Sequence, residues 1–110
     1  GRHTDFLVTP DGRVMHALAA IYILREIPSI QAFQVVQERI DRVTVSVVVG
    51  EGFDEATGAA VVSRFRALLG PRMAVELAVV PEIHRPASGK HLYVISNVAA
   101  EYLRAELALR

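Results

Sequence analysis

Valine recurs at every second position from 43 to 49, and this alternation constrains the fold more than any other feature of the chain. Successive side chains of a β-strand point to opposite faces of its sheet, so Arg42 to Val49 is predicted to be a strand with one buried face. Phe33 to Arg39 is also rich in residues that favour strands. Because only Ile40 and Asp41 separate the two segments, they are predicted to form an antiparallel pair.

Two helices are predicted, one on each side of this pair in the sequence. The first covers Ala17 to Ile27, where apolar residues follow helical spacing, and Pro28 ends it. The second begins after Asp54, whose carboxylate can cap a helix N-terminus, and ends at Gly70-Pro71. The apolar positions that define them are Leu18, Ile21, Tyr22 and Leu24 in the first helix and Val61, Phe65, Leu68 and Leu69 in the second.

Shorter segments complete the order of elements. Pro10-Asp11-Gly12 has the composition of a turn, which predicts a hairpin over Phe6 to Met15. Met73 to Val79 alternates and is predicted to be a third core strand. It is followed by a polar loop, a short apolar stretch and a final helix: Glu82 to Lys90, then Leu92 to Ile95, then a helix capped by Asn97 that carries Tyr102, Leu103 and Leu107.

This order predicts an α+β fold: a small ferredoxin-like domain whose antiparallel sheet has two helices packed on one face, with an N-terminal hairpin and a C-terminal helix. A chain of 110 residues, 52% of them hydrophobic, can bury one core but not two. Since the chain opens at Gly1 without an initiator Met, we expect it to be part of a longer protein.

Composition excludes several classes of function. Twelve basic residues balance twelve acidic ones without a block of either sign, so neither nucleic acid nor an anionic membrane is an expected partner. No apolar run is long enough to span a membrane, and the absence of cysteine suits a cytoplasmic protein. The four histidines lack the close spacing of a zinc site, so no metal ligands are predicted. No serine lies in a nucleophile-elbow motif.

The loop that ends at Lys90 has the composition of a flexible arm carrying cations, since Arg85 and Lys90 flank the small residues Ser88 and Gly89. Gly89-Lys90 copies the last two residues of a phosphate-binding P-loop, but that motif also needs Gly at 84 and Ser or Thr at 91. Histidine occupies both positions, so a P-loop is excluded. Taken alone, the loop is compatible with a solvated surface lysine.

A second motif near the N-terminus changes this interpretation. Gly1-Arg2-His3-Thr4-Asp5 precedes the first strand, and Arg85-Pro86-Ala87-Ser88-Gly89-Lys90 precedes the last apolar stretch. The pair, with an α+β domain between, resembles the C-terminal domain of the adenylate-forming superfamily. Within it, Gly1 to Val8 together with Ile30 to Val36 is most similar to the phenylacetate-CoA ligase group and its capsular-polysaccharide relatives.

The resemblance implies a function for the whole enzyme. With ATP and magnesium it would convert a carboxylic acid to an acyl-adenylate, then pass the acyl group to coenzyme A. This domain would be a lid that moves over an N-terminal adenylation domain of the same chain, which holds most of the ATP and Mg site. The resemblance further implies roles for single residues. Lys90 would be the catalytic lysine, Arg2 would bind the nucleotide ribose, Thr4 and Asp5 would form the hinge, and Arg85, Ser88 and Gly89 would belong to the flexible loop.

The sequence departs from the family's pattern at three places. The hinge position, two residues after the arginine, is commonly Asp or Lys in the family but is Thr4 here. Asp5 matches the second of the two acidic residues that the family has at this place. His84-Arg85 replaces the usual Pro-Lys or Pro-Arg, and His91 stands where an apolar residue is usual. An alternative of another class stays open: a stand-alone ferredoxin-like (ACT-like) regulatory module that binds a small ligand and forms a homodimer through its sheet.

Overall fold

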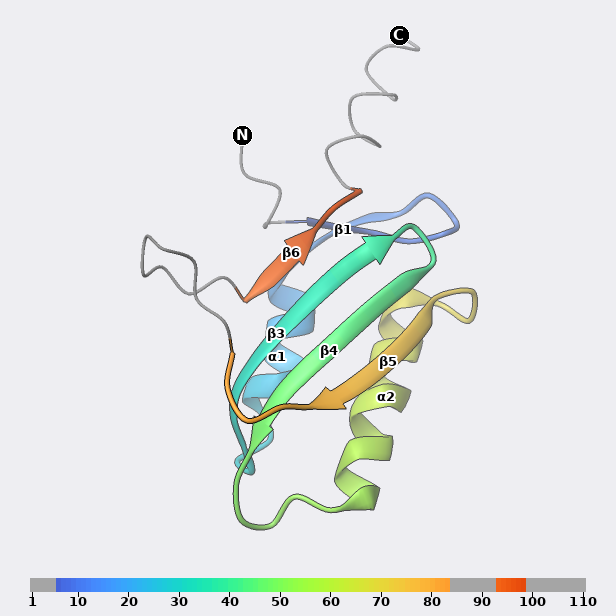
Figure 1. The fold of residues 1–110 in the computed structure, drawn as a ribbon. Coiled ribbons are helices and arrows are strands. Elements are labelled where there is room, and N and C mark those ends of the chain that lie inside the picture. The colour runs from blue at the N-terminus through green and yellow to red at the C-terminus, as the bar shows by residue number, and fades with distance from the viewer. Residues whose placement is uncertain (1–5, 84–92, 99–110) are drawn as a thin grey trace, which may run out of the picture.

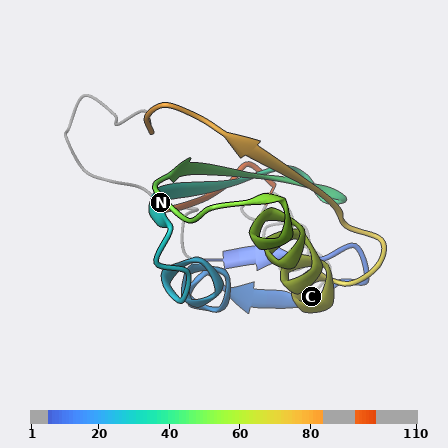
Figure 2. The same ribbon diagram turned by 90° about the horizontal axis from the view of Figure 1, so that it is seen from below.

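A computed structural model of the chain describes residues 6–83 and 93–98. These residues form a four-stranded sheet and a two-stranded hairpin with two helices (Figure 1). In chain order the elements are β1 (Phe6–Val8), β2 (Val14–His16), α1 (Leu18–Arg25), β3 (Ile30–Arg39), β4 (Arg42–Val49), α2 (Glu55–Leu69), β5 (Ala74–Val79) and β6 (Val94–Ser96). Seen along the sheet, α1, α2 and the hairpin all lie on the same side of it (Figure 2).

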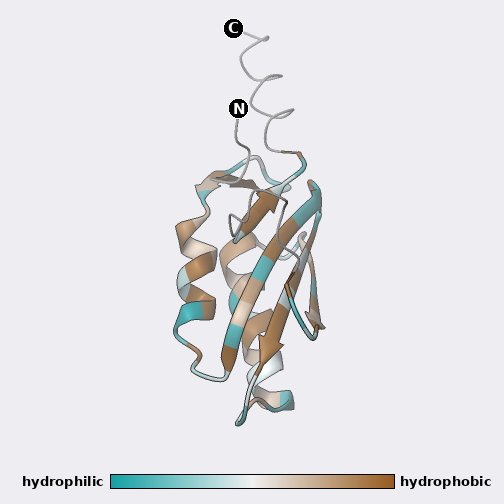
Figure 3. Cartoon of the chain, turned by 60° about the vertical axis from the view of Figure 1, so that its left-hand side comes forward, coloured by the Kyte–Doolittle hydropathy of each residue, from teal (hydrophilic) through white to brown (hydrophobic). Residues whose placement is uncertain are grey.

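The central strands of the sheet are β3 and β4, and their alternating pattern creates the buried face. They pair antiparallel, with Phe33 opposite Val47 and Val35 opposite Val45. All four side chains are buried, at most 6% exposed, because they point toward the helices. The hydropathy of the chain alternates along these long strands as this predicts (Figure 3). Phe65 and Val61 of α2, both fully buried, contribute to the same core from the other layer.

The outer strands of the sheet run parallel to their neighbours. The strand order is β5-β4-β3-β6, and β5 pairs parallel with β4 while β6 pairs parallel with β3. A parallel neighbour requires a crossover connection, and α2 provides it between β4 and β5. The sheet is therefore mixed, and only its central pair is antiparallel as the sequence predicted.

Most other fold predictions are confirmed. The α+β class, the two helices on one face and the hairpin are present, and α1 lies within the predicted helix. Strand β3 begins at Ile30, three residues before the predicted start at Phe33. Val94 and Ile95, which end the predicted apolar stretch, form the edge strand β6 with Ser96, and the sequence did not predict this strand. The predicted final helix after Asn97 lies outside the described residues. Within residues 6–83 and 93–98, no helix is long and apolar enough to span a membrane.

Helix α2 begins at the predicted cap. The Thr57 backbone N–H donates to Asp54 Oδ1 at 2.8 Å, and the Thr57 hydroxyl donates to the same oxygen at 2.8 Å. These donors favour the charged carboxylate and therefore hold the pKa of Asp54 below its ordinary value of 3.8. At the other end, Gly70 adopts φ +97°, a conformation that other residues rarely adopt, and its N–H donates to Arg66 O at 2.9 Å.

Substitution of the cap should make stability depend on pH in a defined window. We expect Asp54→Ala to lower the melting temperature of the chain by about a few degrees at pH 7. Because the folded-state pKa of Asp54 lies below its unfolded value, its contribution is complete above about pH 4 and disappears as the pH falls through the folded pKa. The melting temperatures of the unsubstituted chain and of Asp54→Ala, measured from pH 2 to pH 7, should therefore converge at the acid end. Asp54→Asn keeps a capping side chain without this titration, so a convergence of that variant with Asp54→Ala at pH 7 would contradict the assignment.

Candidate functional site

The residues that the sequence singled out for function lie outside the described part of the chain. This holds for Arg2, Thr4 and Asp5 at the start, and for the loop residues Arg85, Ser88, Gly89 and Lys90. Their roles stay predictions. The structure does describe the two strands that follow these segments, and through them the places where both motifs join the fold.

The N-terminal motif joins the fold at β1, whose first residue, Phe6, directly follows Asp5. Leu7 and Val8 are buried, 1% and 0% exposed. The turn that closes the hairpin is held by Thr9, since its N–H donates to Arg13 O at 2.8 Å and its hydroxyl accepts from Arg13 N–H at 3.0 Å. The Thr9 hydroxyl also donates to Asp11, and with the Arg13 guanidinium 3.2 Å from Asp11 Oδ2 it keeps the pKa of Asp11 below its ordinary value. The end of β1 thus leads into a turn that several hydrogen bonds close.

The Lys90 motif joins the fold at Tyr93, the residue before β6. The Val35 N–H donates to the carbonyl oxygen of Tyr93 at 2.8 Å. The Tyr93 ring packs against Phe33 with ring centroids 5.2 Å apart. The guanidinium of Arg25, at the end of α1, lies 5.4 Å from the centroid of the Tyr93 ring. Contacts to β3 and α1 therefore fix the point where the chain returns from the Lys90 loop to the sheet.

The two strands meet at Gln37, a fully buried side chain of β3. Its amide nitrogen donates to Val8 O at 2.5 Å, and its amide oxygen accepts from Val8 N–H at 3.1 Å. The same oxygen accepts from the Ser96 hydroxyl of β6 at 2.9 Å. The structure therefore brings together the strands that follow the two motifs, although the motifs stand near opposite ends of the sequence.

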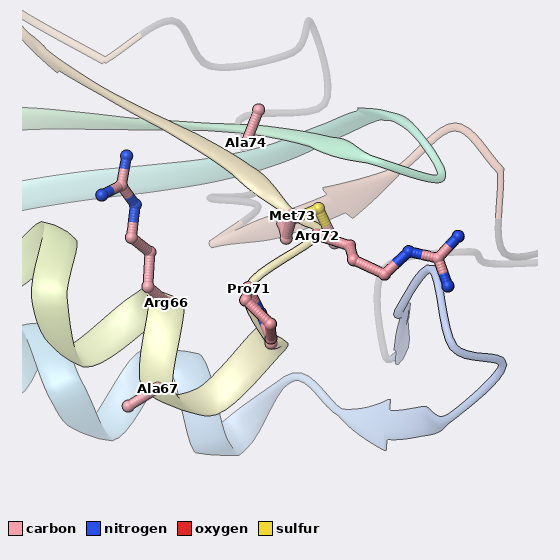
Figure 4. A pocket seen from close by; sticks show the side chains of 7 residues that line it. Arg66, Ala67, Pro71, Arg72, Met73 and Ala74 are labelled. Carbon is pink, nitrogen blue, oxygen red and sulfur yellow. The ribbon is translucent and has the colours of Figure 1, made fainter.

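A second feature of interest is a depression of about 610 Å³ where α2 ends and β5 begins. Arg66 extends from α2 on one side of it and Arg72 on the other, with Pro71 and Met73 between (Figure 4). Within the described residues neither guanidinium forms an ion pair, whereas Arg64 on the same helix lies 2.9 Å from Glu26. Two exposed guanidiniums without acidic partners can bind an anion such as a phosphate group.

Metal ligation has no candidate in the part of the chain that the structure describes, where no three His, Asp or Glu side chains come together. The depression and Gln37 were both missed by sequence reasoning. Gln37 had a detectable signal, because it follows Phe33 and Val35 at an inward position of a strand where an apolar residue is the rule. The depression had no such signal in the sequence, because the ion pairing of Arg66 and Arg72 depends on the tertiary structure.

Comparison with solved structures shows the same fold in other proteins. A domain of phenylacetate-coenzyme A ligase from Bacteroides vulgatus ATCC 8482 superposes with a TM-score of 0.59 at 16% identity, covering 88% of this chain and 96% of that one. Acetoacetyl-CoA synthetase from Streptomyces lividans gives 0.60 at 22% identity, over 84% of this chain and 14% of the synthetase. Fatty acyl-adenylate ligases from E. coli and L. pneumophila give 0.61 at 19%, over 99% of this chain and 20% of the ligase. The chain thus spans only a small part of these two larger enzymes.

A comparison of the sequence with curated proteins gives no match. The model of one protein family, described as the CapK C-terminal domain, matches residues 7–97. With the solved structures, this match confirms the resemblance to adenylate-forming enzymes of the phenylacetate-CoA ligase group. The chain is a member of the CapK C-terminal domain family.

Proposed function

We propose that the chain is the C-terminal lid of an ATP-dependent ligase that forms an acyl-adenylate and then a coenzyme A thioester. One structural observation carries the proposal. The strands that follow the Arg2 motif and the Lys90 motif are joined through the amide of Gln37, which bonds Val8 at the end of β1 and Ser96 at the end of β6. That these two strands lie together in one domain supports a function in which both motifs act on one nucleotide.

The chemistry proceeds in two half-reactions. A substrate carboxylate attacks the α-phosphorus of ATP, forming the acyl-adenylate and releasing pyrophosphate. The ammonium of Lys90 stabilises the negative charge on the carboxylate and phosphate oxygens, and the guanidinium of Arg2 binds the ribose hydroxyls. The thiol of coenzyme A then attacks the acyl carbon, and AMP leaves. Magnesium would neutralise charge on the phosphates, and a larger N-terminal domain would hold it together with most of the ATP.

The proposal implies movement between the two half-reactions. Lys90 is required only for adenylation, and a different face of the domain serves the thiol acceptor. Rotation about a hinge at Thr4 and Asp5 would exchange these faces over the N-terminal domain. The small share of the larger solved relatives that this chain covers, 14% to 22%, is consistent with such a partner domain.

The depression between Arg66 and Arg72 is the best candidate for contact with coenzyme A. Coenzyme A carries phosphate groups, and these guanidiniums have no acidic partner among the described residues. The apolar side chains between them offer a surface for the rest of the molecule. This assignment predicts that both arginines serve thioester formation and neither serves adenylation.

A double variant, Arg66→Ala with Arg72→Ala, tests the proposal in the full-length parent protein. The parent should catalyse carboxylate-dependent exchange of pyrophosphate into ATP and should form the thioester. We expect the double variant to raise the KM for coenzyme A by about a hundredfold or more, since each of the two lost charge-assisted hydrogen bonds contributes about 1.5–3 kcal/mol. The exchange rate should stay within about twofold.

Arg64→Ala is the matched control, because it removes an arginine of the same helix that pairs with Glu26 instead. An equal rise in KM for both variants would exclude the depression as the coenzyme A surface. A parent protein without exchange activity would remove the ligase assignment altogether. A stable dimer of the chain that binds a small ligand through its sheet would favour the regulatory module.

A further inference from the structure

A second depression, shallow and about 480 Å³ in volume, lies beside the first half of α2, and we call it the apolar groove. A concave surface of this size can hold part of a small molecule. Its lining is apolar except at the helix start, where Asp54 and Glu55 stand: the other members are Phe53, Gly58, Ala59, Val62 and Leu77.

The groove exists because α2 leaves part of the inward face of β5 uncovered. Val79 pairs in register with Val47 of β4, so the two side chains lie on the same face of the sheet. Val47 is fully buried, whereas Val79 is 58% exposed. Gly58 lets the helix approach β5 closely, since a Cβ at this position would lie 3.2 Å from a methyl group of Leu77. Among the described residues, an apolar strip of β5 therefore stays open beside α2.

One face of α2 connects the apolar groove with the depression between Arg66 and Arg72. The helix runs beside β5 (Figure 1), and Ala59, Val62 and Arg66 are three and four residues apart, a spacing that makes them neighbours on a helix surface. Ala59 and Val62 line the groove, and Arg66 lines the depression. The rise from Ala59 to Arg66 is about 10 Å. A ligand that occupies both places needs anionic groups at one end and an apolar arm at least this long.

Coenzyme A has this shape. Its pantetheine arm leads from the phosphates to the thiol and consists of methyl, methylene and amide groups with one hydroxyl. About thirteen bonds separate the nearest phosphorus from the sulfur, which at the extension of a peptide chain amounts to about 15 Å. With phosphates on the guanidiniums of Arg66 and Arg72, an extended arm reaches along Val62 and Ala59 as far as Phe53.

We propose that the apolar groove binds the pantetheine arm of coenzyme A while Arg66 and Arg72 bind its phosphates. The inference rests on the proposed function and adds a direction to it, because it places the thiol at the N-terminal end of α2. This end of the helix then faces the acyl-adenylate when the thioester forms. The groove supplies apolar contact along the arm, and the arginines supply charge at the other end.

Ala59→Phe in the full-length enzyme tests the groove, because an aromatic ring at this exposed position fills the groove without a change of charge near the phosphates. We expect the KM for coenzyme A in thioester formation from a preformed acyl-adenylate to rise about tenfold. The inhibition constant of adenosine 3′,5′-bisphosphate, a nucleotide that lacks the arm, should stay within about twofold. Ala60→Phe is the matched control, since Ala60 is the next exposed alanine of α2 and does not line the groove.

The outcomes separate this inference from the proposed function. A rise in KM in Ala59→Phe alone, with an unchanged inhibition constant, supports the groove, and the variant with Arg66→Ala and Arg72→Ala should weaken the binding of both molecules. Equal KM values in Ala59→Phe and Ala60→Phe, or an equal loss of affinity for both molecules in Ala59→Phe, overturn the inference. The ligase assignment then stands if pyrophosphate exchange and thioester formation are intact. A parent protein that forms no thioester overturns both.

Discussion

Lys90→Ala in the full-length enzyme is expected to reduce carboxylate-dependent pyrophosphate exchange by about 10²-fold to 10³-fold or more. Lysine is the cation that the loop is proposed to bring to the carboxylate and phosphate oxygens as their charge redistributes. A preorganised charge has its largest effect in a closed site from which water is excluded, and removal of one such donor has an effect of this size in other enzymes. The measurement is isotope exchange between pyrophosphate and ATP at saturating carboxylate.

The second half-reaction provides an internal control for the same variant. Thioester formation from a preformed acyl-adenylate should continue at the wild-type rate, since Lys90 has no role once pyrophosphate has left. Arg85→Ala, a cation in the same loop, is the matched substitution and should reduce exchange far less. If Lys90→Ala exchanges pyrophosphate normally, the assignment of this lysine is wrong.

Gln37→Met is expected to have the largest effect on stability of any substitution proposed for this domain. Methionine fills a similar volume but leaves the N–H and C=O of Val8 buried without the amide that now bonds both. Each buried unsatisfied group costs about 1–3 kcal/mol, so loss of both bonds should lower the free energy of unfolding by about 2–6 kcal/mol. Urea denaturation of the 110-residue chain measures this change.

Gln31→Met is the matched control for this effect, because Gln31 is an exposed glutamine of the same strand. It should change the free energy of unfolding by no more than about 0.5 kcal/mol. A loss of similar size in both variants would mean that replacement of any glutamine in β3 destabilises the sheet, and the bonds between Gln37 and Val8 would then have no special weight.

The fold could be predicted from the sequence wherever a local pattern determines it. The valines at alternate positions of β4 require one buried face, and Asp54 and Gly70 mark the ends of α2. The direction of the outer strands could not be predicted in this way. Alternation states which side chains point inward but not which strand lies beside which, and Val94–Ser96 is too short to show alternation at all.

In the candidate site, too, only the features that a local motif determines could be predicted from the sequence. The assignments of Arg2 and Lys90 came from a resemblance between motifs, and the strands beside them now have described anchors at Val8 and Tyr93. That Arg66 and Arg72 form no ion pair within residues 6–83 and 93–98 depends on where the acidic side chains lie in space. Sequence spacing does not contain that information: Arg64 on the same helix pairs with Glu26, the residue at the C-terminus of α1, which is 38 positions earlier in the sequence.

The strand order has a consequence for the connection that contains Lys90. Strands β5 and β6 form the two opposite edges of the sheet and run in opposite directions, so β5 ends at the same end of the sheet where β6 begins. Three strand spacings separate these points, about 14 Å, which four or five extended residues could cover. The chain uses residues 80 to 93 instead. The sheet therefore sets only a minimum length for this connection, and the length present in the chain exceeds it.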